Sequence, residues 1–71
     1  MQIIVNLDVM LAKRKLRLRQ LAAEVGLSEQ ALSMIKTGKV KGVRFETLIK
    51  LCDVLDCQPG DLLEFRREES N

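Results

Sequence analysis

The sequence predicts an all-α domain of five short helices, and three observations support this fold class. Apolar residues recur at helical spacing through most of the 71-residue chain. Glycines directly follow two of these periodic stretches, as they do where helices end. Apolar types make up 46% of the residues, which is typical of a packed globule, and no apolar run approaches the ~20 residues that cross a bilayer. We therefore expect one domain over residues 1–71, with no membrane segment and no secretion signal.

The first two helices are expected over residues 7–15 and 18–25. Asn6 is a candidate N-cap for the first helix, and Gly26 follows the second, where a glycine freely adopts a positive φ. Each helix carries one apolar stripe that is expected to face the core, and together these stripes comprise Leu7, Met10, Leu11, Leu18, Leu21, Ala22 and Val25.

The third helix is expected to begin behind Ser28, a favoured N-cap residue, and to stop at Gly38. The residues that it directs inward are Ala31, Leu32 and Ile35. A short basic loop over residues 39–44 leads to a fourth helix over residues 45–56. The apolar spacing of this helix predicts that its buried residues are Phe45, Leu48, Ile49, Cys52 and Leu55.

The ends of the chain have a different character. Pro59 fits the first turn of a brief fifth helix that reaches Leu63. Residues 2–5 and 64–67 resemble strands, and each segment is too short to be stable alone. They are expected to form a small two-stranded antiparallel pairing, either within one chain or across a dimer.

Charged residues are segregated along the sequence. Between Lys13 and Arg44 there are nine basic and two acidic residues, a local net charge of +7. The rest of the chain carries −5, so the overall net charge is only +2. A basic stretch with acidic flanks suits a polyanionic partner that meets one face of the molecule. A charge run alone is more often a solvated surface, so a nucleic-acid partner needs a more specific signal.

That signal lies in residues 18–37. Their pattern specifies particular residue types at particular positions, which an amphipathic helix alone does not require. Two helices of about two turns each are joined by Gly26 and Leu27, and Ala22 stands where the helices must cross closely. A larger side chain at position 22 would hold them apart. The spacing is typical of a helix-turn-helix, which presents its second helix to the DNA major groove. An unrelated helical hairpin is the alternative interpretation.

These residues resemble the Cro/cI-type repressors, also called the XRE group. The run LAAEVGLSEQALSMIKTGK at residues 21–39 looks like the family's helix-turn-helix, TLIKLCDVL at 47–55 resembles its fourth helix, and QPGDLL at 58–63 is similar to its closing helix. The resemblance implies a five-helix lambda-repressor-like domain that binds palindromic operator DNA as a homodimer. It also implies a cytoplasmic regulator of transcription, usually a repressor.

Side chains near the start of the third helix are expected to lie closest to the base edges. Gln30 is the strongest candidate, because its amide can pair bidentately with N6 and N7 of adenine. Glu29 can accept from N4 of cytosine or can simply favour the positive end of the helix. The expected base readers are Ser28, Glu29, Gln30, Ser33 and Met34. The expected phosphate contacts are Arg17, Arg19, Lys36, Thr37, Lys39, Lys41 and Arg44.

The sequence departs from the family pattern at two places. Many members begin the second helix with a polar cap followed by Gln, and here Arg17 and Leu18 hold these positions. Many also pair an arginine of the first helix with a glutamate near the end of the third, where this chain has Leu11 and Lys36. Joint loss of both partners leaves no unpaired buried charge, and it is expected to free Lys36 to face DNA.

Other chemistry is not expected. The chain has no His, and Cys52 and Cys57 offer too few ligands for zinc, so no metal, cofactor, small-molecule substrate or enzymatic activity is predicted. Cys52 is interpreted as a core residue and Cys57 as a small residue at a helix end, with a redox switch as the alternative. An antitoxin-like protein-interaction module is the alternative function. A dimer could form through the terminal strands or through the fourth and fifth helices.

Overall fold

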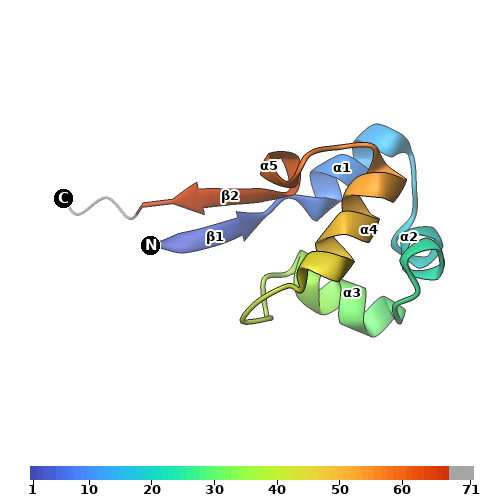
Figure 1. Cartoon of the computed structure of the whole chain (residues 1–71), viewed down its shortest axis with the longest axis horizontal. Coiled ribbons are helices and arrows are strands. Elements are labelled where there is room, and N and C mark those ends of the chain that lie inside the picture. The colour runs from blue at the N-terminus through green and yellow to red at the C-terminus, as the bar shows by residue number, and fades with distance from the viewer. Residues whose placement is uncertain (68–71) are drawn as a thin grey trace.

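The computed structural model describes residues 1–67, so the last four residues of the expected domain lie outside the described residues. Five helices form one body, and a two-stranded ribbon projects from it (Figure 1). In chain order the elements are β1 (Gln2–Val5), α1 (Leu7–Arg14), α2 (Leu18–Val25), α3 (Glu29–Lys36), α4 (Phe45–Leu55), α5 (Pro59–Leu62) and β2 (Leu63–Arg66). The projecting ribbon explains the elongated extents of 43 × 22 × 19 Å. Among the described residues, none of the helices has both the length and the apolar character that a bilayer crossing requires.

A small apolar core holds the helices together. α2 packs on both α3 and α4, while α1 packs on α4 and α5. The buried residues are Leu7, Met10, Leu11, Leu21, Ala22, Val25, Leu32, Leu51, Leu55 and Leu62. All ten are hydrophobic, and no polar or charged residue among residues 1–67 is buried. The hydrophobic effect therefore provides most of the stabilisation of this core.

A left-handed residue directly follows α1, α2 and α4, and one follows α3 after Thr37. Gly26 and Gly38 adopt φ values of 75° and 73°, as expected of glycines at this position. Lys15 and Asp56 adopt φ values of 56° and 49° without being glycine. The expected ends of the first and fourth helices are therefore one residue too late, because these two helices end at Arg14 and Leu55.

Of the two N-caps predicted from the sequence, one is confirmed and one is wrong. Ser28 Oγ accepts a hydrogen bond from the main-chain N–H of Ala31 at 3.0 Å, as a serine N-cap does. The side chain of Asn6 makes no capping bond to α1. Instead its Nδ2 donates to Oε1 of Glu64 at 3.3 Å, and its main-chain N–H donates to the oxygen of Leu62 at 2.8 Å. Asn6 is thus used to join the ribbon to the helices.

The buried face of α4 differs from the expected one. Phe45 and Ile49 are 81% and 67% exposed, whereas Leu51, which was not among the expected core residues, is 2% exposed. Leu48 and Cys52 are half-buried, and Leu55 is fully buried. The reason is that α4 carries two apolar stripes at helical spacing, and periodicity alone does not say which stripe faces the core.

The expected pairing of the terminal segments is confirmed, and it forms within one chain. β1 and β2 are antiparallel, with the register Gln2↔Arg66, Ile3↔Phe65, Ile4↔Glu64 and Val5↔Leu63. Because side chains alternate between the two faces of a strand, Ile3, Val5, Leu63 and Phe65 share one apolar face of the ribbon. β2 begins at Leu63, where α5 was expected to end.

Candidate nucleic-acid interface

The turn between α2 and α3 is built by main-chain hydrogen bonds. The N–H of Leu27 donates to the oxygen of Ala22 at 2.9 Å, across the positive φ of Gly26. This bond pattern closes α2 and turns the chain, after which Ser28 caps α3. Ala22 is 3% exposed, and its small side chain permits the close crossing of the two helices. Residues 18–36 therefore form the expected helix-turn-helix.

The start of α2 is stabilised differently from the family pattern. Arg17 is the N-cap, but an arginine side chain has no acceptor for the first N–H groups of the helix. The side chain of Gln20 reaches back instead, and its Oε1 accepts from the main-chain N–H of Arg17 at 2.9 Å. Leu18 is half-buried and packs on the core. Arg17 and Arg19 are exposed on either side of it.

The first turn of α3 faces solvent. Ser28, Glu29 and Gln30 are exposed, and one turn later Met34 is 42% exposed while Ser33 is half-buried. Buried Leu32 holds the opposite side of α3 on the core. The expected base readers thus lie along one accessible side of a helix that the core holds in place. Glu29 also lies in the first turn, where its carboxylate favours the positive end of the helix.

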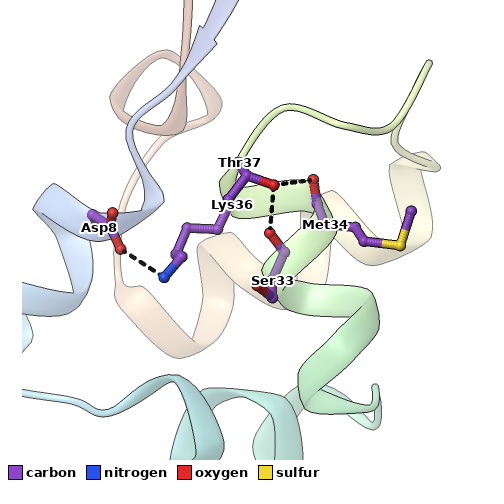
Figure 2. Close-up of polar contacts among 5 residues, drawn as sticks. All are labelled: Asp8, Ser33, Met34, Lys36 and Thr37. Carbon is purple, nitrogen blue, oxygen red and sulfur yellow. Dashed lines mark hydrogen bonds and ion pairs between the residues drawn. The ribbon is translucent and has the colours of Figure 1, made fainter.

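Lys36 does not share this side of α3. Its Nζ lies 3.6 Å from Oδ1 of Asp8 in α1, and its side chain is only 27% exposed. In Figure 2 the Lys36 side chain extends to Asp8 while that of Met34 leaves α3 in another direction. Lys36 is therefore not left without an acidic partner as expected, and its contact with DNA stays a prediction. This pair also joins α1 to α3, but from Asp8, which lies about one turn before Leu11.

Thr37 is also engaged within the protein. Its hydroxyl lies within hydrogen-bonding distance of two main-chain oxygens, those of Ser33 at 3.0 Å and Met34 at 3.4 Å (Figure 2). A hydroxyl has one hydrogen to donate, and a phosphate oxygen can only accept. Thr37 must therefore release its helix-end bond before its side chain can donate to a phosphate.

The remaining basic residues are exposed after α3. Gly38 turns the chain, and the N–H of Lys39 donates to the oxygen of Met34 at 2.9 Å. This bond fixes the direction in which the loop leaves the helix. Lys39, Lys41 and Arg44 have exposed side chains, and Arg44 is the N-cap residue of α4. Among the expected phosphate contacts, the exposed cations are Arg17, Arg19, Lys39, Lys41 and Arg44.

A second accessible surface is apolar, and the sequence did not predict it. We define the apolar surface as Ile3, Phe45, Ile49 and Phe65, which are 55–81% exposed. Two hollows meet at Phe45 and Leu48: one lies between the ribbon and the loop after α3, and the other runs along α4 to Pro59. The signal for this surface was the second apolar stripe of α4, which was assigned to the core.

The described residues contain no group of three or more His, Cys, Asp or Glu side chains that could hold a metal ion. The arrangement offers hydrogen-bonding side chains on the accessible side of α3 and exposed cations around it. These groups suit contact with base edges and phosphates respectively.

The comparisons with known proteins agree with this geometry. A Cro/C1-type HTH DNA-binding domain model matches residues 6–68. The chain is 51% identical over 69 residues to the uncharacterised HTH-type transcriptional regulator YozG of Bacillus subtilis strain 168, covering 97% of this chain and 82% of YozG. A crystal structure of a candidate DNA-binding protein from Bacteroides fragilis superposes with a TM-score of 0.77 at 25% identity, covering 89% of this chain and all of that one. The chain therefore belongs to the Cro/C1-type helix-turn-helix family of DNA-binding regulators of transcription.

Proposed function

We propose that this chain binds a palindromic operator as a homodimer and represses transcription by placing α3 in the major groove. The observation that carries this proposal is the exposure of Gln30 and Met34 on a helix whose opposite side is anchored by Leu32. A groove-reading helix needs its outward side free and its position fixed, and α3 has both properties. As a DNA-binding regulator, it acts in the cytoplasm, at the nucleoid.

Sequence discrimination is assigned to the first turns of α3. Gln30 pairs with an adenine edge, and Glu29 accepts from cytosine N4 or disfavours other bases by repelling their acceptors. Ser28 and Ser33 donate hydroxyl hydrogen bonds, and Met34 offers an apolar contact to a thymine methyl group. Ser28 Oγ already accepts from Ala31, so its hydroxyl hydrogen remains available to a DNA acceptor.

Affinity is assigned to the cations that flank the helix-turn-helix. Arg17 and Arg19 meet the backbone beside α2, while Lys39, Lys41 and Arg44 follow it beyond α3. Thr37 contacts phosphate only if its hydroxyl gives up the hydrogen bond to the main chain of α3 and donates to the phosphate instead. Lys36 adds positive charge to the domain, but its side chain is held by Asp8. Among the expected phosphate contacts, we therefore expect Lys36 to contribute least to DNA affinity.

Dimerisation is assigned to the apolar surface, against which a second copy of the chain packs. Large exposed apolar side chains on both the ribbon and α4 form one region through the hollows that share Phe45. Covering them removes apolar area from water, which stabilises a domain whose own core is small. The two sites considered from the sequence, the strands and α4–α5, are thus parts of one surface.

Selection of binding sites from random double-stranded DNA tests the DNA-binding proposal. We expect two symmetric half-sites whose centres lie about 10 base pairs apart or a multiple of that spacing. Binding that shows no sequence preference at any salt concentration would contradict it. Repression is tested by placing the selected site over a reporter promoter, where expression of the chain is expected to lower transcription.

Sedimentation tests the dimer. Phe45→Glu introduces a charge at an 81% exposed position and is expected to yield a folded monomer. Val9→Glu is the matched control, because Val9 is a half-exposed apolar residue on α1 outside the apolar surface, and this variant is expected to remain dimeric. If both variants sediment as the unsubstituted chain does, the second copy binds elsewhere.

A further inference from the structure

Two thiols meet where α4 ends. The N–H of Cys57 donates to the main-chain oxygen of Cys52 at 3.0 Å, across the left-handed residue Asp56. In this type of helix end the side chains of the two residues joined by that bond lie against each other. Both cysteines are unbridged, and Cys52 lies close enough to Cys57 to raise the pKa of its thiol.

We propose that Cys52 and Cys57 form a reversible intramolecular disulfide by exchange with an oxidised small-molecule disulfide of the glutathione type. The backbone places them within range. Since the Cα atoms are bonded next to the two ends of the 3.0 Å contact, they lie no more than about 7 Å apart. A disulfide spans Cα separations up to about that value, so the backbone separation permits the bond.

The exchange proceeds in two balanced steps. The thiolate of one cysteine attacks the external disulfide, forms a mixed disulfide and releases one small-molecule thiol. The thiolate of the second cysteine then attacks the protein sulfur of the mixed disulfide and releases the second small-molecule thiol. The protein pair loses two electrons and two protons, which the external disulfide takes up as two thiols.

The surroundings of the pair permit this reaction. Both cysteines are half-buried and line the hollow that runs along α4 to Pro59, so a small disulfide reaches them from solvent in the single chain, before a second copy covers this hollow. Burial and the neighbouring Cys52 raise the pKa of the Cys57 thiol; Asp61 adds to this increase and Arg14 opposes it. Cys57 therefore stays mainly a thiol near neutral pH, and its ionisation does not stabilise the dithiol form.

The test equilibrates the intact chain in buffers of reduced and oxidised glutathione, with acid quenching and mass mapping. Trypsin releases residues 51–66 as one peptide that contains both cysteines. We expect this peptide to lose two hydrogens in the unsubstituted chain. Cys52→Ser and Cys57→Ser are expected to carry one glutathione adduct instead. An unsubstituted chain that stays reduced, or that collects only glutathione adducts, overturns the proposal.

A second measurement tests whether the folded structure favours the disulfide, or whether the closeness of the two cysteines in the sequence is sufficient. The same equilibrium is measured in concentrated urea, and the disulfide is expected to form at least about tenfold more favourably in the folded chain, because the helix end orients the thiols. An equal or smaller constant in the folded chain overturns the proposal. Neither readout requires DNA, so failure here and failure of operator binding are distinguishable.

Discussion

The guanidinium of Arg14 closes the carboxyl end of α4 by donating from Nε to the main-chain oxygen of Leu55 at 2.6 Å. A second nitrogen of the same side chain donates to the oxygen of Asp56 at 2.9 Å. The last carbonyls of a helix lack partners within the helix and carry partial negative charge, so a cation placed there is favourable. Arg14 thereby ties α1 to α4, which are far apart in the sequence.

We expect Arg14→Ala to destabilise the fold by about 1–2 kcal/mol, because two hydrogen bonds from a charged donor are lost and one is partly shielded from water. Chemical denaturation measures this loss. Arg14→Lys retains the charge without the planar fork and is expected to recover part of the stability. Equal stability of all three proteins would show that solvent replaces these bonds without cost.

Asp56→Gly is expected to stabilise the protein by about 0.5–1 kcal/mol. Asp56 adopts a φ of 49°, which glycine tolerates better, although the gain is reduced by the greater freedom of glycine in the unfolded chain. The substitution also removes a negative charge from the negative end of α4. Asp56→Asn isolates this charge effect, because asparagine keeps the backbone cost close to that of aspartate. Thermal unfolding of the three proteins gives the comparison.

The ribbon is expected to weaken in acid through Glu64. Hydrogen bonds from Arg66 and Asn6, and the charge of Arg66, hold the pKa of Glu64 below its usual value of 4.5. A lowered folded-state pKa means that the stabilisation is present above the unfolded value and is lost as pH falls through the folded one. Glu64→Gln should therefore lose less stability than the unsubstituted chain between neutral and acidic pH. Matching denaturation profiles over that range would argue against this contribution.

Gln30→Ala is expected to cost about 1–3 kcal/mol of binding at one base pair of each half-site and to relax the preference there. Site selection with the variant measures both effects. Gln2→Ala removes the same side chain from an exposed position on β1 and serves as the control. If the selected sequences are unchanged for Gln30→Ala, this residue does not read a base.

Lys41→Ala is expected to weaken binding to all sequences alike and to lower the slope of log affinity against log salt by about 1, as the loss of one phosphate contact requires. Titrations at several salt concentrations give the slope. Lys13→Ala makes the same change in net charge from exposed α1 and should leave the slope nearly unchanged. If the two variants give identical slopes, Lys41 contributes only to the overall positive charge and makes no phosphate contact of its own.

Residues with one dominant structural role were predictable from the sequence. Gly26, Gly38 and Ser28 marked helix ends correctly because their chemistry strongly favours those positions. Lys15 and Asp56 adopt the same left-handed conformation, but neither residue type marks a helix end as clearly as glycine does. The first and fourth helices were therefore predicted one residue too long. The helix-turn-helix itself followed from such position-specific residues.

Features that depend on distant partners were not predictable. Phe45 and Ile49 match a helical stripe as well as Leu51 and Leu55 do, and only the packing of α1 and α2 on α4 decides which stripe is buried. The contact of Arg14 is made with main-chain oxygens, which every residue has, so nothing in the sequence singles them out. The pairing of Lys36 with Asp8 likewise depends on how α1 lies against α3.

The pair of Asp8 and Lys36 limits how this domain can be recombined with its relatives. A hybrid that takes its first helix from a relative with an arginine facing α3 would set that cation against Lys36. The reciprocal hybrid would set a relative's glutamate against Asp8. Either graft juxtaposes like charges at a helix boundary, so the two helices must be transplanted together for the chimera to remain compatible.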